Sequence, residues 1–319
     1  MKADIIKRLR SSAGFVSGRE LCAGAGVTRV AIWKHIRRLQ ELGYEIESGP
    51  RGYRLASEPD TLFPWQFPGR EERIVYLAEA PSTMEIAKEL ARKGCPAFTV
   101  VAAERQSAGR GRLRRVWHSA AGGLYVTVVL RPEIPVLLSA SVNFLASAAL
   151  ARVLRSAYGV AAGLKWPNDI LVQGRKLCGL LSEMEAESDR VAFLNIGIGI
   201  NVNNCVAEVE PPATSLQVLL GRAVPRRELL ALFLDEFEAR MADGGWESAI
   251  AEWKPFSVTL GRPVRIVAGR DELRGVALDV DVDGALILQT PDGSTQKIVY
   301  GDCFPAEVDG AGLRGAAPR

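Results

Sequence analysis

The chain has 319 residues, of which 48% are hydrophobic and 24% are charged, a balance typical of folded globular proteins. This length predicts two or three domains. The five cysteines are scattered without a Cys-x-x-Cys motif and there are only two histidines, which argues against a disulfide framework and against a His/Cys metal site. Neither a signal peptide nor an apolar run of membrane-spanning length is visible, so we expect a cytoplasmic protein without a membrane partner.

Residues 1–58 form the basic part of the chain, with 11 Lys/Arg and 6 Asp/Glu. Ser17 and Glu20 have the spacing of a capping box, and Thr28 can begin a second helix whose apolar residues follow helical spacing. The stretch "YEIESGPRGYRLA" alternates around a Gly-Pro-Arg-Gly turn, as a two-stranded wing would. Three short helices followed by this hairpin predict a winged helix-turn-helix domain.

Basic side chains gather on the helix after Thr28 and on the wing. Such side chains contact phosphates, while the first turns of a recognition helix reach base edges. We therefore predict that this domain binds DNA through the following residues: Thr28, Arg29, Val30, Ile32, Trp33, Lys34, Arg37 and Arg51. The alternative is an amphipathic helix whose charges are only solvated.

The rest of the chain predicts an α+β organisation. Three prolines mark residues 59–72 as a linker. Over residues 73–257, strand-like runs in hairpin-like order accompany helices expected at Thr83–Lys93, Val136–Tyr158 and 226–254, which predicts a mixed, mostly antiparallel sheet backed by helices. Over residues 258–308, short strands with Asp-Gly turns predict a small β-barrel of about five strands. We expect residues 309–319 to be a disordered tail.

An arginine-rich loop, "ERQSAGRGRLRRVWH" (104–118), separates two predicted strands. Gly109 and Gly111 would let the backbone approach a ligand closely, and Arg110 and Arg112 supply forked donors for a carboxylate or a phosphate. The loop therefore predicts an anion site. A solvated surface loop or a second nucleic-acid contact is the alternative.

A second motif is "LKWPNDILVQGRKLCGLLSE" (164–183). Asn168 and Asp169 offer oxygen ligands of the kind that suit Mg²⁺ near phosphates, and Lys165 and Lys176 stand on either side of them. An ordinary Asn-Asp turn with solvated lysines is the alternative.

Two weaker motifs complete the set. "NIGIGINVN" (195–203) lacks the third glycine and the following helix of a dinucleotide-binding fold, so its glycines indicate a strand that a ligand or another backbone approaches closely. Ser82 and Thr83 follow a strand and begin a helix, where their hydroxyls could cap the helix or bind a polar ligand. No Walker phosphate-binding loop occurs.

Three motifs stand in a fixed order: Ser82-Thr83, then Gln106 with Gly109-Arg110-Gly111-Arg112, then Lys165-Trp166-Pro167-Asn168-Asp169 with Arg175-Lys176-Leu177-Cys178-Gly179. In this order they resemble the biotin–protein ligases, and with residues 1–58 the chain resembles the bifunctional members that also repress the biotin operon. The resemblance extends as far as Phe304. It implies a winged helix-turn-helix, a central domain related to class II aminoacyl-tRNA synthetases and an SH3-like barrel.

The resemblance also implies a reaction in two steps. The biotin carboxylate attacks the α-phosphate of ATP in the presence of Mg²⁺, which gives biotinyl-5′-AMP and pyrophosphate. A lysine of the biotin carboxyl carrier protein then takes the acyl group, and AMP leaves. In a bifunctional member, biotinyl-5′-AMP would be the corepressor that favours a homodimer on operator DNA.

By the same resemblance, site residues can be assigned to each ligand. Biotin would contact Ser82, Thr83, Met84, Gln106, Arg110, Gly111, Arg112, Lys176 and Gly179. ATP would contact Arg112, Trp117, Lys165, Asn168, Lys176 and Asn201, and Asp169 would hold Mg²⁺. The catalytic residues would be Arg110, Arg112 and Lys176.

The chain departs from the usual family pattern at Pro81, Met84 and Arg114, the last of which stands where a glycine often occurs. Two alternatives remain open at this point. One is a lipoate–protein ligase of the related fold, and the other is a ligand-sensing transcription factor without ligase activity.

Overall fold

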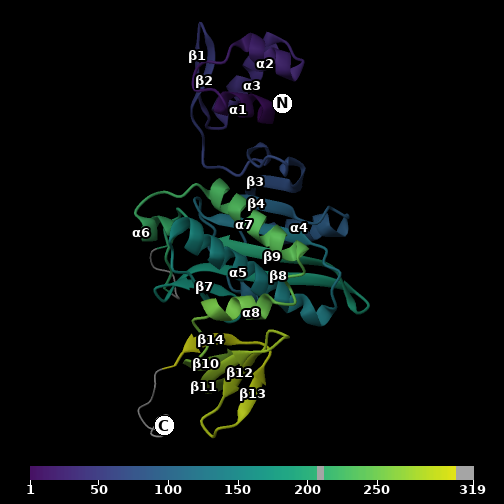
Figure 1. Cartoon of the computed structure of the whole chain (residues 1–319), viewed down its shortest axis with the longest axis vertical. Helices are drawn as coiled ribbons and strands as arrows, with labels where there is room; N and C mark the ends of the chain where they lie inside the picture. The colour runs from purple at the N-terminus through teal and green to yellow at the C-terminus, as the bar shows by residue number, and fades with distance from the viewer. Residues whose placement is uncertain (207–211, 307–319) are drawn as a thin grey trace. The chain divides into compact units, whose positions relative to one another are not determined.

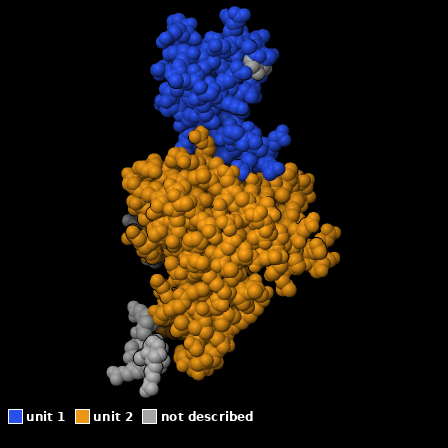
Figure 2. Space-filling model, viewed as in Figure 1, with its two compact units in different colours: residues 1–74 blue, residues 75–319 orange. Residues whose placement is uncertain are grey.

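A computed structural model of the chain describes residues 1–206 and 212–306, and the tail predicted at 309–319 lies outside them. The chain divides into two compact units, residues 1–74 and residues 75–319 (Figure 2). Each unit is described by itself. The domain limits expected from the sequence stay predictions.

The first unit contains three helices and a two-stranded hairpin (Figure 1). The elements are α1 (Lys2–Arg10), α2 (Gly18–Ala25), α3 (Arg29–Glu41), β1 (Glu45–Gly49) and β2 (Gly52–Ser57). Ser17 and Glu20 form the expected capping box at the start of α2, and Thr28 Oγ1 accepts a hydrogen bond of 3.3 Å from the Ala31 amide at the start of α3. The predicted winged helix-turn-helix is confirmed.

Residues 59–74 group with this first unit. They contain two 3-10 helices, Pro64–Gln66 and Glu71–Arg73. Trp65 Nε1 and Gln66 Nε2 each donate a hydrogen bond of 2.9 Å to the Tyr44 hydroxyl, which follows α3. The segment that the prolines predict as a linker is thus fastened to the winged domain at this point.

A seven-stranded sheet forms the centre of the second unit, in the order β3-β4-β5-β9-β8-β7-β6. The strands are β3 (Ile74–Ala80), β4 (Thr99–Gln106), β5 (Leu124–Leu130), β6 (Gly163–Lys165), β7 (Asp169–Val172), β8 (Arg175–Glu187) and β9 (Arg190–Ile200). Across the sheet, from β4 through β5, β9, β8 and β7 to β6, neighbouring strands are antiparallel. The hairpin-like order of strands expected from the sequence is therefore observed.

Helices cover both faces of this sheet. On one face, α4 (Thr83–Arg92) places Ala87 and Ala91 in a buried cluster with Val101, Val129 and Phe193. The strand residues of opposite parity face α5 (Ser139–Tyr158), against which α7 (Arg226–Ala242) and α8 (Ala249–Trp253) pack. A short helix, α6 (Leu216–Leu220), completes the set.

Two helix predictions need correction. The helical region expected over 226–254 consists of two helices, because Gly244 takes a left-handed conformation, with φ of 70°, just after α7 ends. The helix expected from Val136 begins as a 3-10 turn over Val136–Leu138 before α5. Residues Val136–Tyr158 are long and apolar enough to cross a membrane, but 67% of their most apolar window is buried in the protein, as in a core helix.

The chain ends in a five-stranded antiparallel sheet of order β13-β12-β11-β10-β14. Its strands are β10 (Pro263–Ala268), β11 (Asp271–Val280), β12 (Leu286–Gln289), β13 (Thr295–Ile298) and β14 (Asp302–Pro305). Trp166 Nε1 donates a hydrogen bond of 2.9 Å to the Gly284 carbonyl, which connects this sheet to the central one. The α+β fold class, with a winged domain and a small C-terminal β domain, is confirmed.

Candidate functional site

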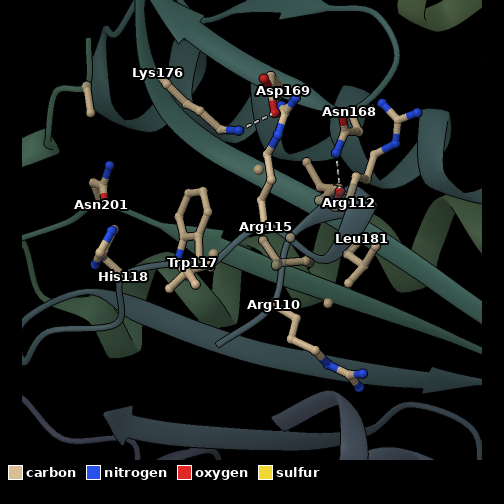
Figure 3. Close-up of a pocket in the computed structure, with 18 of the residues that line it drawn as sticks. Arg110, Arg112, Arg115, Trp117, His118, Asn168, Asp169, Lys176, Leu181 and Asn201 are labelled. Atoms are coloured by element: carbon tan, nitrogen blue, oxygen red, sulfur yellow. Dashed lines mark hydrogen bonds and ion pairs between the residues drawn. The ribbon is translucent and has the colours of Figure 1, made fainter. Parts of the chain in front are cut away.

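One pocket in the second unit collects the three motifs identified in the sequence (Figure 3). Every residue expected to contact biotin, ATP or Mg²⁺ lines it: Ser82, Thr83, Met84, Gln106, Arg110, Gly111, Arg112, Trp117, Lys165, Asn168, Asp169, Lys176, Gly179 and Asn201. They come from the start of α4, the end of β4, the arginine loop, and strands β6 to β9. Segments far apart in the sequence therefore meet at one site.

Uncharged polar groups line the pocket where α4 begins. The Thr83 amide donates a hydrogen bond of 2.8 Å to Gln106 Oε1, and the Thr127 hydroxyl donates one of 2.9 Å to Thr83 Oγ1. Gln106 Nε2 in turn donates to Ser119 Oγ at 2.8 Å. Ser82 and Thr83 are both buried. This part of the pocket suits a neutral polar group that both donates and accepts hydrogen bonds.

Two glycines of β9 form the floor of the pocket. A Cβ atom at Gly197 would lie 2.8 Å from Met84 Cε, and one at Gly199 would lie 2.4 Å from Trp117 Cε2. Both distances are shorter than real Cβ contacts allow, so a larger residue at Gly199 would displace the Trp117 ring, and one at Gly197 would displace the flexible end of Met84. The close approach expected from "NIGIGINVN" is made here by side chains.

A cluster of cations surrounds one carboxylate at the other end of the pocket. Lys176 Nζ lies 2.7 Å from Asp169 Oδ1, and Lys165 Nζ lies 3.9 Å from Asp169 Oδ2. The Lys176 ammonium also stands 5.4 Å from the centre of the Trp117 ring. Figure 3 shows Lys176 and Asp169 pointing toward each other across the top of the site. This end of the pocket suits an anionic ligand.

The arginine loop folds back on itself as a tight hairpin. The Gly111 amide donates to the Arg115 carbonyl at 2.8 Å, and the Trp117 amide donates to the Gly109 carbonyl at 2.9 Å. These hydrogen bonds bring Trp117 over the glycine floor. The loop therefore covers the pocket.

The same loop reaches the C-terminal β domain. Arg112 Nη1 donates to the Gly301 carbonyl at 3.2 Å and to Asn168 Oδ1 at 3.4 Å, and it lies 3.9 Å from Asp302 Oδ1. Arg115 forms an ion pair with the same Asp302 carboxylate. Burial lowers the pKa of the Arg112 guanidinium, against the opposing effect of Asp302 and Asp169. A partly desolvated arginine interacts strongly with an incoming anion.

Comparison with known proteins identifies the family. Residues 76–203 match the biotin/lipoate A/B protein ligase family, residues 2–54 match the HTH domain, and residues 259–304 match the biotin protein ligase C terminal domain. The bifunctional ligase/repressor BirA of Bacillus spizizenii is 37% identical over 95% of this chain and 98% of that protein. The chain belongs to the biotin protein ligase family.

Other relatives agree with this assignment. The bifunctional ligase/repressor BirA of Escherichia coli is 29% identical, and the match covers 88% of this chain and 90% of that protein. The structure of the biotin protein ligase from Aquifex aeolicus in complex with biotin and ATP aligns with a TM-score of 0.62 at 26% identity, and it covers 73% of this chain and 99% of that one. The family resemblance predicted from the sequence is confirmed.

One predicted catalytic residue of this biotin protein ligase, Arg110, does not lie with the cation cluster in the structure. Its guanidinium forms an ion pair with Glu85 of α4 and lies 3.9 Å from Glu183 of β8. Figure 3 shows the side chain directed away from Lys176 and Asp169. Two carboxylates attract it to the outer side of the loop, so in this structure Arg110 fastens the loop to α4.

Thr127 and Asp302 are among the residues of the pocket that sequence reasoning missed. Thr127 is a fully buried polar residue. Its position in the largely apolar strand "LYVTVVL" is the signal that could have indicated it. Asp302 stands in "YGDCFPAE", which no spacing connects to the arginine loop, and only the folded chain brings it to Arg112 and Arg115.

The predicted DNA contacts lie on α3 and the wing of the first unit. Val30 and Trp33 are unusually exposed for apolar residues, at 63% and 50%, and the Arg37 guanidinium stands 5.4 Å from the centre of the Trp33 ring. Ile32 is only 1% exposed and packs in the core, so we correct its assignment as a DNA contact. The remaining candidates, Thr28, Arg29, Val30, Trp33, Lys34, Arg37 and Arg51, are all exposed.

Proposed function

We propose that this biotin protein ligase activates biotin with ATP and transfers the biotinyl group to a lysine of a biotin carboxyl carrier protein. The observation that carries the proposal is one pocket with a neutral polar end, formed by Ser82, Thr83 and Gln106, and a cationic end, formed by Arg112 and Lys176. Biotin has the matching polarity, because it combines a neutral cyclic urea with a terminal carboxylate. The ring would lie at the neutral end, and its carboxylate would face the two cations.

In the first step, a carboxylate oxygen forms a bond to the α-phosphorus of ATP, and the bond from that phosphorus to the bridging oxygen breaks. Pyrophosphate leaves, and biotinyl-5′-AMP remains. Arg112 and Lys176 would stabilise the negative charge that develops on the phosphate oxygens. Trp117 already lies over the glycine floor, so the same loop would shield the adenylate from water.

Lys165, Asn168 and Asn201 line the part of the pocket that would receive ATP. A Mg²⁺ ion bound with nucleotide commonly uses one or two carboxylates and fills its other positions with phosphate oxygens and water. No group of three or more His, Cys, Asp or Glu side chains that could hold a metal occurs over residues 1–206 and 212–306. Asp169 therefore fits as a single protein ligand, and the ion would neutralise phosphate charge.

In the second step, the uncharged amine of the acceptor lysine attacks the acyl carbon of biotinyl-5′-AMP. The bond from this carbon to the phosphate oxygen breaks, AMP leaves, and the nitrogen loses a proton. The loop must open for this step, because Trp117 and Arg112 cover the pocket. A cytoplasmic location, where carrier protein and ATP are available, stays a prediction.

The winged domain supports a second function, which is repression of biotin genes. The exposed basic and apolar residues of α3 fit operator DNA, and biotinyl-5′-AMP would act as corepressor by favouring a homodimer that binds two half-sites. The test is the affinity for operator DNA, together with the sedimentation of the protein, with and without biotinyl-5′-AMP. Equal affinities would contradict the proposed regulation.

The ligase function has two direct tests. Biotin, but not lipoate, should support exchange of labelled pyrophosphate into ATP, and the reverse result would favour a lipoate–protein ligase. The intact mass of a carrier domain should rise by one biotinyl group after incubation with enzyme, biotin and ATP with Mg²⁺. An unchanged mass would favour a ligand-sensing transcription factor without ligase activity.

A further inference from the structure

Asn195, in the middle of β9, has a fully buried side chain. Its two side-chain polar atoms, Oδ1 and Nδ2, are both buried and without a hydrogen-bond partner. Among residues 1–206 and 212–306, no other residue has two such atoms. Burying a carboxamide in this state is costly, and an apolar side chain of similar shape would avoid the cost. A function that uses the amide in another state of the protein would explain its presence.

The register of the sheet places Asn195 beside the pocket. Side chains alternate along a strand, so Asn195 points to the same face as Phe193 and Gly197. Phe193 belongs to the apolar cluster beneath α4, whereas Gly197 lines the pocket. Across the sheet, Asn195 pairs with Val129 of β5 and with Glu183 of β8. The carboxamide therefore lies between the cluster under α4 and the pocket floor.

Met84 is the side chain that covers this boundary. It extends from the first turn of α4, and its Cε would lie 2.8 Å from a Cβ atom at Gly197, the next residue along this face from Asn195. Methionine is unbranched and changes rotamer easily, so it can move when a ligand enters. Movement of the Met84 thioether would join the space above Gly197 to the Asn195 carboxamide.

The other polar groups at this end of the pocket are already engaged. Thr83 bonds to Gln106 and to Thr127, and Gln106 bonds to Ser119. A ligand must compete with these bonds, but it would gain the donor and the acceptor of Asn195 without breaking any described hydrogen bond. A cyclic urea carries an N–H next to a C=O, which is the pattern complementary to a carboxamide.

We infer that Asn195 is a specificity-determining residue that reads the cyclic urea of biotin once Met84 moves aside. This inference rests on the proposed function, because it takes biotin as the ligand. It assigns the amide a role in binding and none in the chemical steps. It also explains why a polar residue with no partner occupies a site where an apolar one would stabilise the fold.

The test uses the full chain with Asn195→Leu, which keeps a similar volume and removes both polar atoms. Calorimetric titration with biotin alone should show affinity weakened about tenfold, the change expected when a neutral hydrogen bond to the ligand is lost. The melting temperature without ligand should stay equal or rise. Desthiobiotin, which keeps the cyclic urea and lacks the sulfur ring, should lose affinity by the same factor.

Asn143→Leu is the matched control, since Asn143 is a buried asparagine of α5 that does not line the pocket. It should leave biotin affinity unchanged. If Asn195→Leu does not fold, Asn195→Val serves instead, because a β-branched residue suits a central strand. Wild-type affinity for biotin in the folded variant would overturn the inference, as would a loss confined to biotin and absent for desthiobiotin.

Failure of this inference can be told apart from failure of the proposed function. Wild-type protein is first assayed for biotin-dependent exchange of pyrophosphate into ATP. No exchange would contradict the ligase function itself. Normal exchange together with unchanged biotin affinity in Asn195→Leu would contradict only the role given to Asn195.

Discussion

Lys176 Nζ lies 2.7 Å from Asp169 Oδ1, and the two residues belong to adjacent strands, β8 and β7, that are joined by a tight turn. The turn residues, Gln173 and Gly174, both have positive φ. The hairpin therefore presents a lysine and a carboxylate together at one end of the pocket. An anionic ligand would meet a cation that is already held in place, which lowers the cost of ordering a long side chain.

Replacing Lys176 by alanine tests this arrangement. Lys176→Ala should lower the rate of biotin-dependent pyrophosphate exchange by about 100-fold or more, the usual cost of removing one group that stabilises transition-state charge. Stability to urea should fall by roughly 1–3 kcal/mol, because the ion pair is mostly buried and its loss leaves the Asp169 carboxylate with Lys165 alone. Lys93→Ala, an exposed lysine after α4, is the control and should keep full activity. Turnover close to wild type in Lys176→Ala would remove Lys176 from the mechanism.

The sequence predicted the elements of the site better than their connections. Asp169 and Lys176 are close in the chain, and the two-residue turn between their strands brings them together by local geometry. A single motif was therefore enough to predict their proximity. The break in the helical region over 226–254 was not predicted, because it depends on one left-handed residue, Gly244, which composition over a long window hides.

Contacts between distant segments could not be predicted. Arg112 and Asp302 are separated by almost two hundred residues, and nothing local to "YGDCFPAE" indicates a partner. The direction of Arg110 depends on Glu85 and Glu183, which belong to two further elements. The unpaired state of Asn195 is likewise a property of packing, because the same residue at an exposed position would be hydrated.

Asp302 connects the C-terminal β domain to catalysis through Arg112 and Arg115. Asp302→Asn should raise the KM for ATP by about three- to tenfold, because the closed loop loses its ion pairs and closure becomes less favourable by roughly 1 kcal/mol. The KM for ATP in pyrophosphate exchange is the measurement. Asp283→Asn is the matched control, since Asp283 pairs with Lys297 in the same β domain and does not line the pocket. Equal KM values for wild type and Asp302→Asn would show that this contact does not affect closure.

Arg114 has a left-handed backbone conformation, with φ of 60°, directly after Leu113, which has φ of 54°. Each non-glycine residue in this region costs about 1–2 kcal/mol. Arg114→Gly should therefore favour the folded loop over its open form. Arg114→Ala removes the same charge and keeps the strain, so it is the matched control.

Trypsin cleavage within the loop measures this difference, since both variants lose the same arginine. We expect the Gly variant to be cut about fivefold more slowly than the Ala variant, which corresponds to roughly 1 kcal/mol in loop opening. Faster cleavage of the Gly variant would mean that added flexibility outweighs the relief of strain.

Two truncations test which residues complete the DNA-binding unit. Leu62, Phe63 and Phe67 are buried, and Tyr44 accepts the hydrogen bonds of the intervening turn. Removing residues 1–58 takes Tyr44 away and leaves these apolar side chains in the product, so we expect poor solubility. Removing residues 1–73 also deletes them and begins the chain at β3, so this product should remain soluble, keep pyrophosphate exchange and lose DNA binding.

Size-exclusion chromatography and the exchange assay on both truncated products measure these differences. A soluble, active product from the first truncation and an aggregated one from the second would mean that residues 59–73 belong functionally with the ligase unit.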